Sequence, residues 1–400
     1  MKKMCPQLIY GVAEQKLNFL GYLVIDSTID GKSSGGIRMS TEVTLEETAS
    51  LAKNMTLKCG FLGIPKGGAK AGIRVNGLLS KDERKSVFTE FGKYIGRFIE
   101  SGHFFPGTDM GTTNEDVDLV LNSALGEKKH RKHAPTHVYT SWTMLVSAKV
   151  VLNSLGLELK ESTVAIEGFG KVGSSAAHVF SKNGAKIVGV STIQGAIYNP
   201  KGLDAEKLLN MRKEFGDDLV NLYKGAKKLT TDELKKMPLD ILLPCAGSWT
   251  INSNNAYEVR SKIVCPGANI PLTEKAEEIL LKRDIIVIPD FVSNSGGMLG
   301  AFIGSKLSER GKWAIIEREF GRRVSEIIRR SKERNVSPRK VATRMALTRF
   351  NRIKANSEEK NSKKQVLKVI RRIVPKAHRE IIARLIAPRT FAKMVHERNT

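Results

Sequence analysis

The first 140 residues mix a strand pattern with a helical pattern. Residues 20–26, Leu-Gly-Tyr-Leu-Val-Ile-Asp, are typical of a strand, and serines and glycines at 33–36 interrupt it. Thr44 and Glu47 have the spacing of a capping box, which predicts a helix N-terminus. An apolar stripe continues this helix to about Lys58, and Gly60 is its expected end.

From about residue 162, short apolar runs alternate with helical segments. Each run has the length of a buried strand, and the residues between runs are sufficient for crossover helices. This alternation predicts β-α-β units and therefore a parallel sheet. The runs are 163–167, 186–191, 239–243, 262–265 and 285–290. A long helical region is expected from Gly297 to about residue 355, with a break near 335–338.

The composition excludes some classes of protein. A hydrophobic content of 41% excludes a disordered polymer, and no apolar run approaches the length of a membrane span. The basic start is not followed by a sustained apolar stretch, so a secretory signal is not expected. Four separated cysteines without a CxxC pair indicate neither a disulfide scaffold nor a zinc ribbon. We expect a cytoplasmic protein.

The formal net charge of +25 is unevenly distributed over the 400 residues. Residues 305–400 hold 28 basic and 9 acidic residues, a net of +19, so the rest of the chain is nearly balanced. Residues 356–400 combine basic residues with apolar residues at helical spacing, and Pro375 and Pro388 limit their helices. Such a segment either packs on its own protein, which we prefer, or contacts nucleic acid, an acidic partner or a membrane surface.

A glycine-rich turn directly follows the first of the apolar runs. Residues 168–173 are Gly-Phe-Gly-Lys-Val-Gly, and a helical pattern and a second strand come next. These glycines permit a tight turn, and the helix N-terminus offers N–H groups to a pyrophosphate. The second strand ends without the acidic residue that binds ribose hydroxyls, which leaves NAD and NADP open. The expected cofactor contacts here are Gly168, Phe169, Gly170, Lys171, Val172, Gly173, Ser191 and Thr192.

Lysines stand among glycines and apolar residues in the N-terminal part, at Lys58, Lys66 and Lys70. A lysine in a partly desolvated pocket has a lowered pKa and can act as a base near neutral pH, while a second lysine can hold a carboxylate. Asp109 adds a carboxylate in a glycine-bracketed loop. The alternative is that Lys58 and Lys66 are surface charges and that Asp109 is a turn residue.

Nine segments of the chain occur in the order and at about the spacing of one family. They are GGIRM (35–39), MTLK (55–58), PKGGAKAG (65–72), TDMGTTNEDVD (108–118), EGFGKVG (167–173), IYNPKGLD (197–204), DILLPCA (240–246), GAN (267–269) and NSGG (294–297). Over residues 8–355 the chain resembles the Glu/Leu/Phe/Val (amino-acid) dehydrogenase superfamily and is glutamate dehydrogenase-like.

The resemblance implies roles for individual residues. Lys58 matches the lysine that holds the substrate α-carboxylate, Lys70 matches the catalytic lysine, and Asp109 matches the acid that exchanges protons with the amino group. Asn294 and Asn269 match the asparagines of the NAGG-type and GAN turns. The other implied contacts are Ser34, Gly36 and Ala301 with Asn294 for the substrate, and Thr140, Ala246, Asn269 and Asn294 for the cofactor.

The implied activity is that of an NAD(P)-dependent oxidoreductase acting on CH–NH2 donors. It converts an L-amino acid reversibly to a 2-oxo acid and ammonia by hydride transfer to NAD or NADP, with Lys70 activating the attacking water. The implied fold is α/β: a substrate domain with a mixed sheet (1–138) and a Rossmann-type NAD(P)-binding domain (139–304). Closing helices (305–355) and a basic extension (356–400) follow, and homo-oligomers are usual in this family.

Two positions depart from the glutamate branch of the family. Ser34 replaces a lysine that pairs with the side-chain carboxylate, although Lys32 lies two residues earlier, and Ala301 replaces a serine. The leucine-type branch also lacks that lysine, while GGAKAG and IYNPKGLD look more like the glutamate branch. The substrate therefore stays open between glutamate and a leucine-, phenylalanine- or valine-type amino acid.

The segment 139–144 departs from the family pattern more strongly. Thr140 is kept, but Thr143 replaces a glycine, which leaves open a catalytically weakened regulatory paralogue. The preceding loop contains three histidines, His130, His133 and His137. Pro135 interrupts any helix there and no cysteine ligand accompanies them, so we expect a solvated basic loop and no metal.

Overall fold

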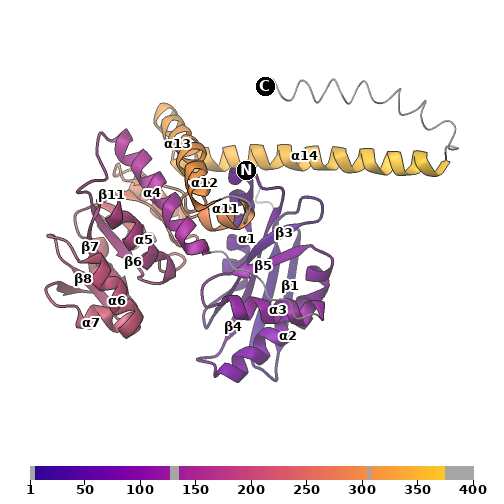
Figure 1. The fold of residues 1–400 in the computed structure, drawn as a ribbon, viewed down its shortest axis with the longest axis horizontal. Coiled ribbons are helices and arrows are strands. Elements are labelled where there is room, and N and C mark those ends of the chain that lie inside the picture. The colour runs from indigo at the N-terminus through magenta and orange to yellow at the C-terminus, as the bar shows by residue number, and fades with distance from the viewer. Residues whose placement is uncertain (1–4, 127–134, 304–307, 374–400) are drawn as a thin grey trace. The chain divides into compact units, whose positions relative to one another are not determined.

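The computed structural model describes residues 5–126, 135–303 and 308–373. Two sheets organise the part of the chain that ends at Asn351 (Figure 1). The first sheet has the order β1-β2-β4-β3-β5, antiparallel from β1 to β4 and parallel from β4 to β5, so the prediction of a mixed sheet is confirmed. Its strands are β1 (Leu8–Glu14), β2 (Phe19–Ile25), β3 (Ser33–Ser40), β4 (Gly67–Val75) and β5 (Phe104–Thr108).

Helices cover both faces of this sheet. A Cβ on Gly72 of β4 would lie 2.7 Å from Thr48 Oγ1 of α1 (Leu45–Leu62), so glycine there lets α1 lie close to the strand. On the other face, a Cβ on Gly21 would lie 2.7 Å from the ring of Phe91 in α2. The helices α2 (Lys81–Glu100) and α3 (Asn114–Leu125) pack side by side on that second face (Figure 1).

Helix α1 differs from its prediction at both ends. Thr44 Oγ1 accepts a hydrogen bond from Glu47 N at 3.1 Å, but the Glu47 side chain turns to Arg38 instead of closing a capping box. The helix continues past the expected end at Gly60 to Leu62, and Gly63, with φ +82°, terminates it. Gly60 has a packing role instead, because a Cβ there would lie 2.3 Å from the carbonyl oxygen of Ala346.

The second sheet has the order β12-β11-β10-β6-β7-β8-β9. It is parallel from β12 to β7, as the apolar runs predict, and β8 and β9 add two antiparallel strands at one edge. Its strands are β6 (Thr163–Glu167), β7 (Lys186–Thr192), β8 (Gly195–Tyr198), β9 (Lys227–Leu229), β10 (Leu239–Pro244), β11 (Ser261–Val264) and β12 (Ile286–Val287).

The last predicted strand, 285–290, was too long. Only Ile286 and Val287 pair with β11, because Pro289 cannot donate to a ladder and Asp290 begins a helix. The helices and turns that connect or follow the strands are α4 (Thr136–Ser154), α5 (Lys171–Lys182), α6 (Ala205–Phe215), η1 (Gly216–Asp218), α7 (Leu219–Leu222), α8 (Thr231–Lys235), η2 (Ala256–Glu258), α9 (Glu274–Leu281), α10 (Asp290–Ser293) and α11 (Gly296–Ile303).

Four helical segments follow α11 within the described residues. The predicted break at 335–338 is confirmed, since Asn335 has φ +50° and Pro338 begins the next helix, which extends beyond the expected end near 355. Residues such as Val324 and Ala346 join the core of the second sheet together with Phe61 of α1. The segments are α12 (Glu309–Ile315), the π-helical η4 (Ile316–Phe320), α13 (Gly321–Arg334) and α14 (Pro338–Ile373). No helix within the described ranges is long and apolar enough to cross a membrane.

Candidate active site

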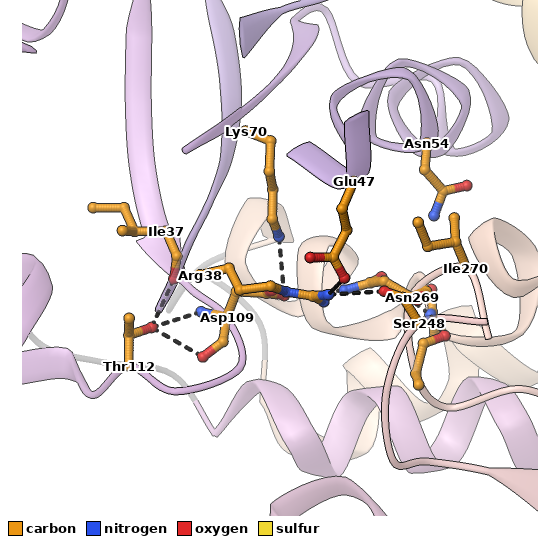
Figure 2. Close-up of polar contacts among 12 residues, drawn as sticks. Ile37, Arg38, Glu47, Asn54, Lys70, Asp109, Thr112, Ser248, Asn269 and Ile270 are labelled. Carbon is orange, nitrogen blue, oxygen red and sulfur yellow. Dashed lines mark hydrogen bonds and ion pairs between the residues drawn. The ribbon is translucent and has the colours of Figure 1, made fainter. Parts of the chain in front are cut away.

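Lys70, Asp109 and Arg38 meet on the face of the first sheet that α1 covers. Lys70 lies on β4, Arg38 lies on β3, and Asp109 directly follows β5. The Lys70 Nζ atom is 3.0 Å from Asp109 Oδ1, and the Arg38 Nε atom is 2.6 Å from Asp109 Oδ2 (Figure 2). Each carboxylate oxygen therefore has its own cation, and three neighbouring parallel strands fix this arrangement.

The surroundings of these groups shift their proton affinities in opposite directions. Only 2% of Lys70 is exposed, and this burial lowers its pKa, with Asp109 opposing the fall and Arg38 adding to it. Burial favours a raised pKa for Asp109, but the charges of Lys70 and Arg38 outweigh it and hold that pKa well below its usual range. Without substrate, the site thus combines an ionised carboxylate with a lysine whose lowered pKa suits it to proton transfer.

Arg38 also connects the two sheets. Its Nη1 atom donates to Glu47 Oε1 at 2.5 Å and to Ser248 Oγ at 2.8 Å, and Ser248 follows β10 of the second sheet (Figure 2). Sequence reasoning gave no role to Arg38, although it is the one charged residue of the GGIRM segment. Its position between the apolar residues Ile37 and Met39 was the available signal.

Lys58 is linked to the same centre through Asn269. Its Nζ atom donates to Asn269 Oδ1 at 2.7 Å, and Asn269 Nδ2 donates to Asp109 Oδ1 at 3.0 Å. Burial lowers the pKa of Lys58 to about 8, with Asp290 opposing the fall and Lys70 adding to it. The predicted residues Lys58, Lys70, Asp109 and Asn269 are therefore in one cluster, and the alternative of surface charges is wrong for Lys58.

Asn294 presents an unused acceptor to this cluster. Its Nδ2 atom donates to Ala268 O at 2.7 Å and to Asn269 Oδ1 at 3.2 Å. Within the described residues, its buried Oδ1 atom has no hydrogen-bond partner. Because a buried acceptor is normally satisfied, this atom indicates a donor that a bound molecule brings.

Asp290 is a further buried carboxylate that sequence reasoning missed. It is fully buried, and its Oδ2 atom accepts from Asn54 Nδ2 of α1 at 2.7 Å and from Ile270 N at 2.8 Å. Its Oδ1 atom accepts from Arg339 Nη2 of α14 at 2.7 Å, and Arg339 also binds Glu277. Asp290 thereby joins α1, the GAN turn and α14, three segments that are far apart in sequence.

The glycine-rich turn lies between β6 and α5. Gly168 has φ +88°, and a Cβ there would lie 2.6 Å from the Cα of Ala246, so only glycine fits. A Cβ on Gly173 would lie 2.1 Å from Gly168 O, whereas a Cβ on Gly170 would meet nothing within 4 Å. Gly168 and Gly173 therefore shape the turn, and Gly170 leaves open space at the N-terminus of α5, where Lys171 is exposed and Val172 is partly buried.

The glycine-rich turn is hydrogen-bonded to the end of β7. Ser191 O accepts from Phe169 N at 2.7 Å, and Ser191 Oγ accepts from Gly168 N at 3.0 Å. Thr192 Oγ1 donates to Asp217 O at 2.7 Å. Glu167, the last residue of β6, is buried and forms an ion pair with Lys235 at 3.2 Å. Sequence reasoning did not identify this residue.

The unusual 139–144 segment has a packing explanation. Helix α4 carries it, and Thr143 Oγ1 donates to Ser293 O at 2.7 Å and accepts from Gly296 N at 3.1 Å. Trp142 stacks on Trp313 of α12, with ring centroids 4.2 Å apart. Thr140 Oγ1 donates to Thr136 O of its own helix. The substituted residues therefore bind α4 to the NSGG turn and to α12.

Of the remaining predicted residues, Gly36 borders the cluster, because a Cβ there would lie 2.9 Å from Asp109 Cβ. Gly36 has no room for a side chain, because a Cβ would lie 2.7 Å from Thr108 O, and Ser34 lies half-buried on β3. Ala301 lies in α11, and its side chain is outside the described residues, as are His130 and His133. Among the described residues, no group of three His, Cys, Asp or Glu residues can hold a metal ion.

Comparison with known proteins identifies the family to which the chain belongs. The model of the Glutamate/Leucine/Phenylalanine/Valine dehydrogenase family matches residues 135–358, and that of its dimerisation domain matches residues 12–124. The chain belongs to the Glu/Leu/Phe/Val dehydrogenase family. It is therefore an amino-acid dehydrogenase that uses NAD or NADP, as the sequence predicted.

The relatives of this dehydrogenase cover most of its length. A glutamate dehydrogenase of Thermotoga maritima is 35% identical over 300 residues, 70% of each chain. An NADP-specific glutamate dehydrogenase of Saccharolobus shibatae is 32% identical over 322 residues, which are 75% of this chain and 76% of the relative. The hetero-hexameric glutamate dehydrogenase of Thermus thermophilus shares the fold, with a TM-score of 0.72, 24% identity and coverage of 87% and 89%.

Proposed function

We propose that the cluster of Lys58, Lys70 and Asp109 binds an L-amino acid and deaminates it oxidatively. The observation that carries this proposal is the buried contact between Lys70 and Asp109, with Lys58 joined to Asp109 through one amide. Buried Lys70 can act as a base, and the buried Asp109 carboxyl group can exchange protons. Lys58, which is joined to Asp109 through the Asn269 side chain, can bind a carboxylate.

The second sheet provides features that fit a dinucleotide. Open space beside Gly170, the N-terminus of α5 and the exposed Lys171 suit a pyrophosphate. The unsatisfied Oδ1 atom of Asn294 suits a hydrogen-bond donor such as a carboxamide or a ribose hydroxyl. A bound nicotinamide cofactor would supply the acceptor for the hydride that leaves the amino-acid Cα.

The residues of the chain would then act in a defined order. Lys58, as an ammonium, holds the substrate α-carboxylate, and ionised Asp109 accepts a proton from the substrate amino group. After oxidation, the neutral amine of Lys70 removes a proton from a water molecule as that water attacks the imine carbon. The Lys70 ammonium then hydrogen-bonds the hydroxyl oxygen of the adduct, and Asp109 returns its proton to the amino group. As ammonia departs, the hydroxyl proton passes to the ionised Asp109, which leaves the 2-oxo acid.

Absorbance at 340 nm tests this proposal. The purified protein is mixed with ammonia, NADH or NADPH and a panel of dicarboxylic and apolar 2-oxo acids. We expect consumption of at least one reduced cofactor with at least one acid, and its loss in Lys70→Ala. A protein that reduces no acid with either cofactor, or a Lys70→Ala variant at the wild-type rate, contradicts the proposed function.

We further propose that residues 1–138 form the substrate domain, 139–304 the cofactor domain, 305–355 closing helices and 356–400 a basic extension.

We also propose a homo-oligomer. The match of residues 12–124 to a dimerisation domain and the position of β1 at a sheet edge, with Ile9 54% exposed, support it. Light scattering during size-exclusion chromatography should give a mass of at least two chains, and a monomer at micromolar concentration contradicts this.

A further inference from the structure

The side chain of Lys66 reaches across one strand of the first sheet. Lys66 stands just before β4, whereas its Nζ atom lies 4.1 Å from the ring centroid of Phe105 on β5. Between these strands lies β3, in which Ser34 pairs with Gly68 on one side and with Phe105 on the other. The Lys66 ammonium is therefore next to a stretch of β3 that carries only the short side chain of Ser34.

This part of the sheet belongs to the face that carries the reacting groups. Side chains alternate between faces along a strand, and laterally paired residues point to the same side. Gly68 and Lys70 are two residues apart on β4, as are Phe105 and Gly107 on β5. Ser34, Phe105 and the Lys70 side chain thus share the face under α1, and Lys66 reaches over it from the loop.

The Lys66 ammonium contacts an aromatic ring, and no described side chain forms an ion pair with it. Within the part of the chain that the structure describes, no hydrogen bond or ion pair engages its Nζ atom, although the residue is half-buried. Burial lowers the pKa of Lys66; Cys59 opposes this fall, and the charge of nearby Lys32 adds to it. A partly desolvated cation over an aromatic face is a site that a carboxylate stabilises.

Cys59 connects this cation to the substrate-binding lysine. Burial raises the pKa of the Cys59 thiol to about 12, and the positive charges of Lys66 and Lys58 both oppose that rise. The Cys59 Sγ atom lies 3.7 Å from the carbonyl oxygen of Gly67, the residue after Lys66. The Sγ atom is also 3.9 Å from the Sδ atom of Met298, which follows the NSGG turn. The sulfur-containing side chains of Cys59 and Met298 therefore pack together next to the segment that carries Lys66.

We infer that Lys66 is a specificity-determining residue, which binds the distal carboxylate of a dicarboxylic amino acid whose α-carboxylate is held by Lys58. The inference rests on the proposed function, because it names the substrate class of the same site. It also accounts for Ser34: the cation that this family's glutamate enzymes carry on β3 enters here from the loop before β4. A small residue on β3 leaves the space that the Lys66 side chain crosses.

The test compares two 2-oxo acids of similar length, 2-oxoglutarate with a distal carboxylate and 2-oxohexanoate without one. We expect wild type to prefer 2-oxoglutarate, and Lys66→Met to lower the ratio of the two kcat/KM values about 100-fold, because a charge-assisted contact is lost. Lys66→Arg should keep most of the preference. Lys85→Met, at an exposed position of α2 on the other face of the sheet, is the matched control and should leave the ratio unchanged.

A relocated charge provides a second, independent arm. Ser34→Lys in the Lys66→Met background should restore at least part of the preference, since Ser34 lies on the strand that Lys66 crosses. Lys66→Gln repeats the measurement if Lys66→Met does not fold. The inference is overturned if wild type prefers 2-oxohexanoate, if neither Lys66 variant changes the ratio, or if Lys32→Met alone abolishes the preference.

Calorimetric binding of glutarate separates this inference from the proposed function. Wild type should bind glutarate, Lys66→Met should bind it at least about tenfold more weakly, and Lys85→Met should match wild type. Lys66-dependent binding in a protein without turnover would refute the proposed function and retain the role of Lys66. Turnover of 2-oxoglutarate with unchanged ratios and unchanged glutarate affinity would refute the role of Lys66 alone.

Discussion

Asn269 donates a hydrogen bond from Nδ2 to Asp109 Oδ1 at 3.0 Å, and this contact joins a turn of the second sheet to a catalytic candidate of the first. The same amide accepts from Lys58 Nζ at 2.7 Å. One side chain therefore orients the proposed acid and the proposed carboxylate-binding lysine together. Because its donor and acceptor ends are both used, neither a carboxylate nor an apolar residue can replace it.

Replacement of Asn269 tests this coupling. Asn269→Ala should reduce kcat/KM for the amino acid about 100-fold, because Lys58 and Asp109 lose their common partner. Asn269→Asp should be at least as damaging, since it places a second anion beside Asp109 and an internal competitor beside Lys58. Steady-state kinetics measure both effects, with Asn221→Ala, an exposed asparagine of α7, as the control. Equal activity of Asn269→Ala and wild type contradicts the proposed coupling.

Removal of the buried Lys70 amine should abolish turnover without unfolding the protein. Lys70→Met should lower kcat by about 1000-fold or more, because no other described side chain contacts Asp109 as a proton-accepting amine. Asp109 keeps the guanidinium of Arg38 at 2.6 Å, so its charge remains compensated and the melting temperature should change little. Quenching of tryptophan fluorescence by NAD(P)H should show retained cofactor binding. A kcat within tenfold of wild type excludes Lys70 as the base.

The pKa of Lys58 predicts a pH dependence. Burial lowers this pKa to about 8, so the free enzyme loses the Lys58 charge above that pH, whereas an exposed lysine keeps its charge to about pH 10. We expect kcat/KM for the 2-oxo acid to fall towards a tenfold loss per pH unit above about 8. The kcat at saturation should fall at higher pH, because a bound carboxylate raises the pKa of Lys58. A flat kcat/KM profile to pH 9.5 contradicts the role of Lys58.

The sequence predicts those parts of this molecule that local chemistry determines. Gly168 and Gly173 are required by a turn whose strand and helix are contiguous in sequence, so the motif and its context suffice. The strands at 163–167 and 239–243 were predictable because their apolar runs are short and bounded. The grouping of Lys58, Lys70 and Asp109 came from a family resemblance, since no periodicity indicates that these residues meet.

The features that were missed depend on contacts between distant segments. Gly60 has the appearance of a helix stop, but the close approach of α14 at Ala346 is what requires glycine there. Asp290 appears to end a strand, yet its partners Asn54 and Arg339 come from other parts of the chain. Gly60 and Asp290 matter because they are buried between segments that are distant in the chain, and a single sequence does not show which segments pack together.

Arg339 should be essential for stability. Its guanidinium compensates Asp290 and Glu277, and burial raises the pKa of Glu277 even though Arg339 opposes that rise. Arg339→Met leaves these buried carboxylates without their cation and should lower the free energy of unfolding by about 3–5 kcal/mol. Lys340→Met, at the exposed neighbouring position, should change it by less than about 0.5 kcal/mol. Urea denaturation measures both, and equal midpoints contradict the role of Arg339.

Gly168 and Gly170 should separate folding from cofactor binding. Gly168→Ala places a Cβ 2.6 Å from the Cα of Ala246 at φ +88°, so it should destabilise the fold by about 1–3 kcal/mol. Gly170→Ala meets nothing within 4 Å and should cost at most about 1 kcal/mol, because alanine is a poorer N-cap of α5 than glycine. Its methyl group nevertheless enters the space at the N-terminus of α5 that we assign to the pyrophosphate, so the Kd for NAD(P)H should rise about tenfold or more. Thermal unfolding and fluorescence titration measure the two effects. A Gly170→Ala variant with wild-type affinity for both NADH and NADPH places the pyrophosphate elsewhere, because a bound phosphate cannot share that space with a methyl group.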